Sequence, residues 1–353
     1  MGAIKCRLTA SIIFVSFFVA SPLYAQTPFY GGKTIIIVLG TSAGGLGDLR
    51  LRAFAPFLKK HIPGNPTVVI ENMPGAGGRK AANHTFRTAR PDGLTIGGLL
   101  PGTVPDAITG EVGVLYDIDK LIYLGTPNRG TGHTAFFTRK EAGLSSIEKM
   151  RTTPGIRIGA PTVGHPHYIL GRWFAYMVGM PNPKFVTGYE GPAIDLALLQ
   201  GEVDGRAHSP DTILLRNREW LEKGLVDFKI VMNVPRGQKH PHPAFANLPE
   251  LESFAKSTRE RRLFDLYEAF RTTGSPLALP PGTPQDRVAI LQDAVRKVFK
   301  DSEFYKEFKK LTGHDAEPLM PEELTKAIRD LPREPEVVEL YTALAGAGPL
   351  PPR

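Results

Sequence analysis

The sequence predicts an α/β protein built from two lobes, and three features carry that prediction. Runs of β-branched and apolar residues alternate along the chain with segments whose apolar residues recur at helical spacing. Strands and helices that alternate in this way form βαβ units around a parallel sheet. The 353 residues, 42% hydrophobic and 22% charged, are enough for one large domain or two lobes with a substantial core. Because no low-complexity linker divides the chain, we expect it to cross between the lobes more than once.

The elements follow in order from the run "TIIIVLG" at 34–40, whose continuous β-branched residues predict a buried strand. Asp48 is a plausible N-cap for a helix that runs to about His61, and Pro56 inside it should kink or shorten it. A later helix is expected to have Thr283 as its N-cap and Pro284 at its first position. The further predicted strands are 66–72, 94–100, 120–126, 155–161, 184–189 and 228–234, and the further helices are 78–89, 166–179, 191–201, 257–272, 283–301 and 320–331. The chain end, "GAGPLPPR" at 346–353, is predicted to be disordered.

The first 25 residues are expected to be a signal peptide, not part of the fold. Lys5 and Arg7 precede a short apolar run, and small residues follow it, which predicts export with cleavage after Ala25. An uncleaved anchor is the alternative, but the apolar run is short for a membrane span. Cys6 is the only cysteine, so the mature protein has no thiol to oxidise after export.

Composition and motifs exclude several classes of function. The net charge of +8 is mild and spread along the chain, and without a dense basic stripe we expect no nucleic-acid partner, although a positive field could attract anions. There is no G-x-S-x-G elbow and no thiol nucleophile in the mature chain. The pairs His165-x-His167 and His240-x-His242 lack the further ligand of a zinc site, so we expect no metal and no cofactor.

Two glycine-rich loops follow predicted strands. The first lies within "GTSAGGLG" at 40–47 and the second within "ENMPGAGG" at 71–78. Glycine lets the backbone approach a ligand, and the N–H groups at a helix start attract anions. Neither loop is a P-loop, and the first lacks the G-x-G-x-x-G order, so an anion site and plain tight turns remain alternatives. If the strands are adjacent and parallel, both loops lie at the carboxyl edge of the sheet, where α/β proteins bind ligands.

Eight motifs occur in order across residues 30–330. They are "AGGLGDLRLR", "VVIENMPGAGG", "RPDGLTI", "YDIDKLIYLG", "IGAPTVGHPHYILGRW", "GYEGPAIDLALLQGEVD", "LPPGTPQDRVAILQDAVRKVF" and "DSEFYKEFKKLTG". In order and spacing this set resembles the Bug-type substrate-binding receptors of tripartite tricarboxylate transporters. No single motif is decisive, and the ordered set carries the resemblance.

The resemblance implies a periplasmic-binding-protein type II architecture, with two lobes hinged around a ligand cleft. Lobe 1 would comprise 31–124 and about 232–345, and lobe 2 would comprise 125–231. It also implies a carboxylate held by the facing loops, partly through water. The positions that match the family's ligand-binding residues are Ser42, Ala43, Gly44, Asp48, Ala76, Gly77, Gly102, Thr103, Thr162, His167, Tyr189 and Ser209.

The chain departs from the family pattern at a few of these segments. Ser42 replaces a usual Pro, Met73 replaces a usual Arg, and His165 and Pro166 stand where small residues are common. His167 has two interpretations, a ligand contact or a residue that satisfies backbone groups at a helix start. These departures leave the identity of the carboxylate open. Asp204 and Asp211 are expected to be caps or surface residues and not catalytic acids.

The function that the sequence favours is a monomeric periplasmic receptor, and not an enzyme, that closes on a small carboxylate and delivers it to membrane transporter subunits. Two alternatives remain. One is an exported enzyme that acts on an anionic substrate in the same cleft, and the other is a carboxylate receptor that feeds a signalling system.

Overall fold

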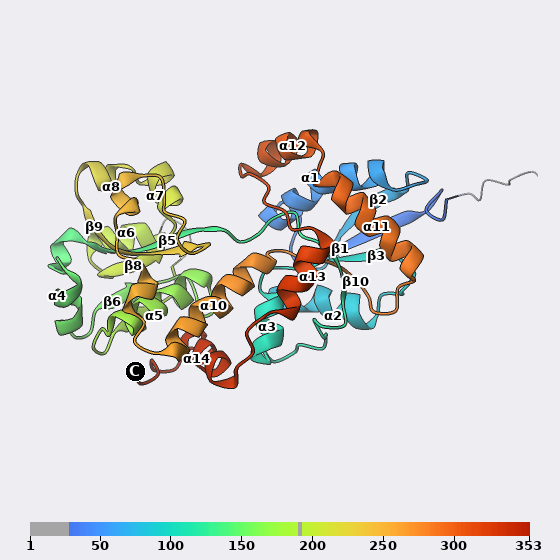
Figure 1. The fold of residues 1–353 in the computed structure, drawn as a ribbon. Coiled ribbons are helices and arrows are strands. Elements are labelled where there is room, and N and C mark those ends of the chain that lie inside the picture. The colour runs from blue at the N-terminus through green and yellow to red at the C-terminus, as the bar shows by residue number, and fades with distance from the viewer. Residues whose placement is uncertain (1–27, 190–192) are drawn as a thin grey trace, which may run out of the picture.

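Two five-stranded sheets organise the chain into two α/β units that lie side by side (Figure 1). The computed structural model describes residues 28–189 and 193–353. The predicted signal peptide, 1–25, and the first two residues of the helix predicted at 191–201 lie outside the described residues. In the described part of the chain, no helix is both long and apolar enough to span a membrane.

The first sheet has the strand order β2-β1-β3-β10-β4. Its parallel half is the predicted one, because β1 pairs in parallel with β2 and with β3. The other half is antiparallel, since β10 returns from the far end of the chain and inserts between β3 and β4. The strands are β1 (Thr34–Leu39), β2 (Thr67–Asn72), β3 (Thr95–Gly98), β4 (Ile122–Gly125) and β10 (Leu277–Leu279).

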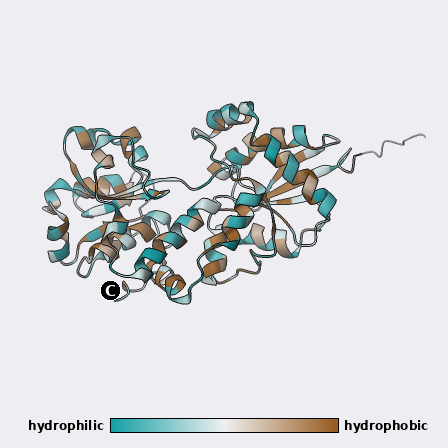
Figure 2. Cartoon of the chain, viewed as in Figure 1, coloured by the Kyte–Doolittle hydropathy of each residue, from teal (hydrophilic) through white to brown (hydrophobic). Residues whose placement is uncertain are grey.

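Helices from both ends of the chain cover this first sheet. Ile37 of β1, Phe54 of α1 and Leu291 of α11 are fully buried in one core, and Figure 2 shows the hydrophobic colour on the strands between the helices. The helices of this unit are α1 (Leu46–His61), α2 (Arg79–Arg87) after the 3-10 turn η1 (Ala76–Gly78), α3 (Thr103–Thr109), α11 (Gln285–Val298), α12 (Ser302–Thr312) and α13 (Pro321–Arg329).

Two helix starts differ from the prediction. Helix α1 begins at Leu46 with Gly45 as N-cap, so Asp48 is not the N-cap; it lies inside the first turn and accepts hydrogen bonds there. Helix α11 begins after Pro284, because the Thr283 hydroxyl donates to the Pro280 carbonyl and does not cap the helix. Helix α1 runs through Pro56 to the predicted end at His61, so the proline does not shorten it.

The second sheet has the order β7-β6-β8-β5-β9 and is also mixed, with β6 parallel to β7 and β8 while β5 is antiparallel to β8 and β9. Its strands are β5 (Gly132–Arg139), β6 (Arg157–Gly159), β7 (Lys184–Val186), β8 (Gly205–His208) and β9 (Val226–Val234). The other elements of this part of the chain are η2 (Lys140–Ala142), α4 (Ile147–Thr152), α5 (Pro166–Val178), α6 (Ala193–Gln200), α7 (Pro210–Arg216), α8 (Glu219–Glu222), α9 (Pro243–Ala246) and η3 (Leu251–Phe254).

Two late helices, α10 (Thr258–Thr273) and α14 (Pro335–Ala345), join the units. Both contact α3 of the first unit, and α14 also contacts α5 of the second. The fully buried Trp173 of α5 lies against Tyr267 of α10 and Tyr341 of α14, with ring centroids 5.2 Å and 6.2 Å away. The strands therefore separate into two units while one aromatic cluster connects them. The exact lobe limits proposed from the sequence stay predictions.

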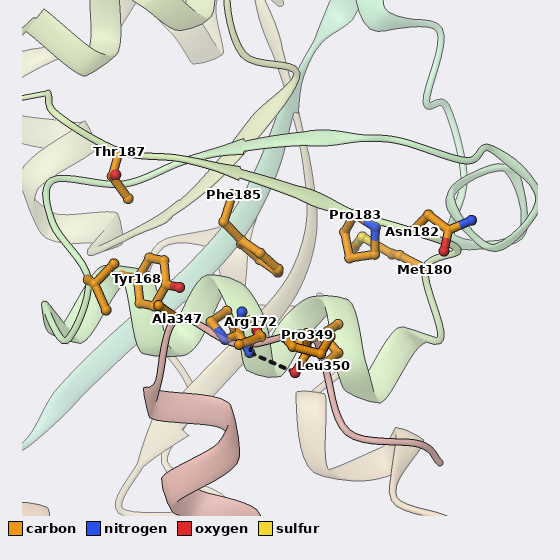
Figure 3. Close-up of a pocket in the computed structure, with 12 residues that line it drawn as sticks. Tyr168, Arg172, Met180, Asn182, Pro183, Phe185, Thr187, Ala347, Pro349 and Leu350 are labelled. Carbon is orange, nitrogen blue, oxygen red and sulfur yellow. Dashed lines mark hydrogen bonds between the residues drawn. The ribbon is translucent and has the colours of Figure 1, made fainter.

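The chain end is packed, so the disorder predicted for 346–353 is wrong. Arg172 of α5 is 1% exposed and donates to the carbonyls of Leu344 and Gly348, at 2.9 Å and 2.8 Å. Arg353 donates to the Glu260 carboxylate at 2.7 Å. Figure 3 shows the tail beside Arg172, where it borders a cavity of about 660 Å³. A buried guanidinium needs acceptors, and the tail carbonyls supply them.

Candidate functional site

Three loops meet at the carboxyl ends of β1, β2 and β3. A Cβ on Gly40 would lie 2.8 Å from the Gly78 Cα, and a Cβ on Gly78 would lie 2.9 Å from Leu100. The loops after these strands therefore pack directly on one another, and only glycine allows that approach. The two glycine-rich loops, expected to converge if the strands were adjacent and parallel, do converge.

The second loop has an unusual backbone. Gly75, Ala76, Gly77 and Gly78 all have positive φ values, 138°, 48°, 64° and 98°. Three of the four are glycines, as this region of conformational space demands, while Ala76 adopts it at a cost. Two amides of this bend are used within it, because Gly78 donates to the Gly75 carbonyl and Arg79 to the Ala76 carbonyl. Ala76 and Gly77, both predicted ligand residues, are exposed on this bend.

Asp48 organises the first loop from inside. Asp48 is buried, and its carboxylate accepts hydrogen bonds from the Gly44 amide at 2.9 Å, from Arg52 Nε at 2.6 Å and from Asn72 Nδ2 at 3.1 Å. Burial raises the pKa of Asp48, but the hydrogen bonds from Arg52, Gly44 and Asn72 outweigh burial and hold the pKa below its ordinary value. Asp48 is thus engaged within the protein, and so is the Gly44 amide, although both were predicted ligand contacts.

The other predicted residues of the first unit divide into two groups. Ser42 and Ala43 are exposed, and their amides have no hydrogen-bond partner among the described residues. Gly102 is exposed at the start of α3. Thr103 is buried, its hydroxyl donates to the Leu100 carbonyl at 2.7 Å, and it faces no open space. The Asp48 and Thr103 side chains are therefore engaged within the protein, whereas the amides of Ser42 and Ala43 have no partner among the described residues.

Two neighbouring cavities lie between the units, of about 600 Å³ and 310 Å³. Both are bordered by α1, α5, α10 and the segment that enters β5. The residues that line both are Arg50, Thr131, Pro166, Tyr267 and Arg271. Three predicted site residues also line them. His167 and Ser209 line the larger cavity, and Gly102 lines the smaller. Ser42, Ala43, Gly44, Ala76 and Gly77 line neither.

The second unit contributes a cluster of histidines at the start of α5. His167 lies between His165 and His208, with ring centroids 5.1 Å and 4.6 Å away. Burial, followed by the charges of His165, Arg206 and Arg271, lowers the pKa of His167 to about 3. Burial and then Arg206 lower the pKa of His208 to about 2. These imidazoles are therefore neutral at physiological pH and offer hydrogen bonds without charge.

Two predicted residues of the second unit lie apart from the cavities. The Tyr189 hydroxyl donates to Glu202 at 3.1 Å, on the same unit. Thr162 is exposed in the loop before α5 and lines neither cavity. Residues 190–192, which follow Tyr189, lie outside the described residues.

Arg50 and Arg271 are the site residues that sequence reasoning missed. Arg50 lies in α1 and Arg271 near the end of α10, and both line both cavities. Arg50 falls within the motif "AGGLGDLRLR", so the signal for it was present, but only the folded chain brings Arg271 beside it.

Within residues 28–189 and 193–353, no group of three or more His, Cys, Asp or Glu residues could hold a metal ion. His240 contacts Asp211 at 3.1 Å and also accepts the His242 amide. His242 caps α9 by accepting the Ala244 amide. These two histidines therefore have structural partners.

No family model matches the chain. Its fold is similar to that of a TctC solute-binding protein from Polaromonas, with a TM-score of 0.59 and 18% identity over 89% of this chain and 98% of that one. It is also similar to MatC from Rhodopseudomonas palustris, solved with bound malate, with a TM-score of 0.53 and 19% identity over 89% and 99% of the two chains. A second R. palustris protein, solved with adipate, has a TM-score of 0.53 and 20% identity over 89% and 97%.

In sequence, the chain is 42% identical over 77 residues to a UPF0065 protein from Cupriavidus necator. That match spans 22% of this chain and 23% of the relative. The fold is that of a two-lobed periplasmic binding protein. The resemblance to Bug-type receptors predicted from the sequence is confirmed at the level of the fold, because solved structures with a similar fold include TctC and Bug solute-binding proteins.

Proposed function

We propose that this protein is a periplasmic solute receptor that captures a small carboxylate between its two units and delivers it to a tripartite tricarboxylate-type membrane transporter. The observation that carries the proposal is the pair of cavities between the units, lined by Arg50 and Arg271 and bordered by the loop that contains Gly102. Positive charge and backbone amides at one edge of a sheet suit a carboxylate.

The similar structures solved with malate and with adipate support the ligand class. Capture would follow from hinge closure, driven by a higher affinity of the ligand for the closed arrangement than for the open one. Delivery requires release, so an affinity in the micromolar range, about −8 kcal/mol, is sufficient. The protein would act as a monomer after removal of the segment 1–25.

A thermal-shift screen of the mature chain tests the proposal. Monocarboxylates, dicarboxylates, tricarboxylates and aromatic acids are added one at a time, with glucose as an uncharged control. A ligand present at 100 times its Kd should add about 2.7 kcal/mol to the free energy of unfolding. Calorimetry then measures the affinity. If no carboxylate raises the melting temperature, the proposal is wrong.

Each of the two alternatives has a test of its own. Conversion of a bound carboxylate into product would favour an exported enzyme. A gene neighbourhood with a sensor kinase in place of transporter membrane subunits would favour a signalling receptor.

A further inference from the structure

Two arginines face the space between the units without a carboxylate to neutralise them. No Asp or Glu lies within ion-pair distance of Arg50 or Arg271 in the described chain. The two acidic residues that line the cavities are engaged elsewhere. Asp106 pairs with Arg79 at 2.9 Å, and Asp211, which is 71% exposed, contacts His240. The positive charge at this point is therefore left for something outside the chain.

Arg50 is the less satisfied of the two. Its Nε is buried and has no hydrogen-bond partner among the described residues. Burial, together with the charge of Arg271, lowers the pKa of Arg50. Proteins seldom bury an arginine donor without an acceptor or place two guanidinium groups near each other without an anion, because each arrangement costs free energy.

Arg271 is held in position by the connection between the units. Its Nε donates to the Gly130 carbonyl at 2.6 Å, and one terminal nitrogen donates to the Thr131 carbonyl at 3.3 Å. A guanidinium has five N–H donors, so this arrangement fixes the group and leaves donors for a ligand. The position of Arg271 is thus set before any ligand enters.

We propose that Arg50 and Arg271 together bind a second anionic group of the ligand, so that the receptor selects dicarboxylates over monocarboxylates. This inference rests on the proposed function, in which one carboxylate group of the ligand lies in the cavity beside the loop that contains Gly102. Gly102 lines the same 310 Å³ cavity as both arginines, so that cavity reaches from a loop of the first sheet to the charged pair. Two guanidinium groups can each form paired hydrogen bonds to a carboxylate, a geometry that lysine cannot reproduce.

The test compares a dicarboxylate with its own monomethyl ester. Calorimetry of the mature chain with the series from malonate to suberate, and with malate, identifies the tightest dicarboxylate. The monomethyl ester of that acid has almost the same shape and one charge fewer. We expect the wild type to bind the diacid at least 30-fold more tightly than the ester.

Arg50→Gln should weaken binding of the diacid at least tenfold and change binding of the ester less than threefold. Lys59→Gln is the matched control. Lys59 is exposed on the same helix, and its substitution removes the same charge. Arg50→Lys keeps the charge and should lose part of the preference for the diacid. If Arg50→Gln does not fold, Arg50→Lys takes its place in the comparison. Arg271→Lys should likewise reduce the preference.

The outcomes separate the two proposals. If the wild type binds no carboxylate at all, the proposed function fails. If it binds carboxylates but does not distinguish diacid from ester, or if Arg50→Gln behaves like Lys59→Gln, this inference is overturned while the receptor function stands.

Discussion

The two units face the space between them with different chemistry. The first-unit wall, formed by Arg50 and Gly102, carries full positive charge and a backbone loop. The second-unit wall includes His167 and Ser209 and is backed by His208. Both histidines are neutral, because burial and then neighbouring positive charges lower their pKa, and the Asp211 carboxylate on this wall contacts His240. The difference indicates a division of labour: one wall attracts an anion, and the other supplies hydrogen bonds that do not depend on charge.

The first-unit wall depends on glycine, and Gly78→Val would break it. Gly78 has φ 98°, and a Cβ there would meet Leu100 at 2.9 Å. A β-branched residue at positive φ is strained and would also overpack the contact, so we expect a loss of about 3 kcal/mol of unfolding free energy, measured by urea denaturation.

Gly102→Ala is the control for that variant. Gly102 has φ −74°, and a Cβ there would meet nothing within 4 Å. The free energy of unfolding of the Gly102→Ala variant should stay unchanged or rise by up to about 1 kcal/mol. Equal losses in the two variants would show that close packing of the three loops does not set the stability of this wall.

The second-unit wall should be the pH-sensitive one. With pKa values of about 3 and about 2, His167 and His208 are neutral in the folded protein and take up protons on unfolding. The unfolded chain then binds more protons below its own histidine pKa of about 6.5, so stability falls as the pH falls through that value. Between pH 7 and pH 5.5 we expect a loss of about 1 kcal/mol for each histidine.

Urea denaturation at pH 7 and at pH 5.5 measures the free energy of unfolding, and the difference between the two values gives the slope of stability against pH. The double variant His167→Asn with His208→Asn should lose about 2 kcal/mol less than the wild type over the same interval. If the double variant keeps the wild-type slope, the histidines are not held neutral.

Local patterns in the sequence predicted some elements of each unit and missed others. Strand β1, a β-branched run, and α5, with its proline start, lie close to where they were expected. Strands β8 and β10 were missed because "GRAH" buries polar residues and "LAL" is three residues long, so neither has a periodicity to detect. Pairings of β10 with β3 and β4 bring together residues far apart in sequence, and no local signal reports them.

For the candidate site, too, local sequence patterns predicted only some of the contacts. Glycine-rich loops after adjacent parallel strands could be expected to converge, because the carboxyl ends of such strands share an edge. Whether a polar side chain faces solvent or the interior could not be predicted, which is why Asp48 and Thr103 were taken for ligand contacts. The packing of 346–353 follows from the buried charge of Arg172, which the composition of the tail does not indicate.

Within the first unit, Asp48 and Arg52 allow a buried member of an ion pair to be compared with its exposed partner. The two side chains form one ion pair at 2.6 Å, but Asp48 is 1% exposed and Arg52 is 51% exposed. Asp48→Asn would place an amide donor opposite the donors of Gly44, Arg52 and Asn72 and should cost about 1–3 kcal/mol. Arg52→Gln removes a partner that water can replace and should cost less than about 1 kcal/mol. Urea denaturation of both variants at pH 7 measures the difference. If Arg52→Gln costs as much as Asp48→Asn, the ion pair and not the buried hydrogen bonds holds the first loop in place.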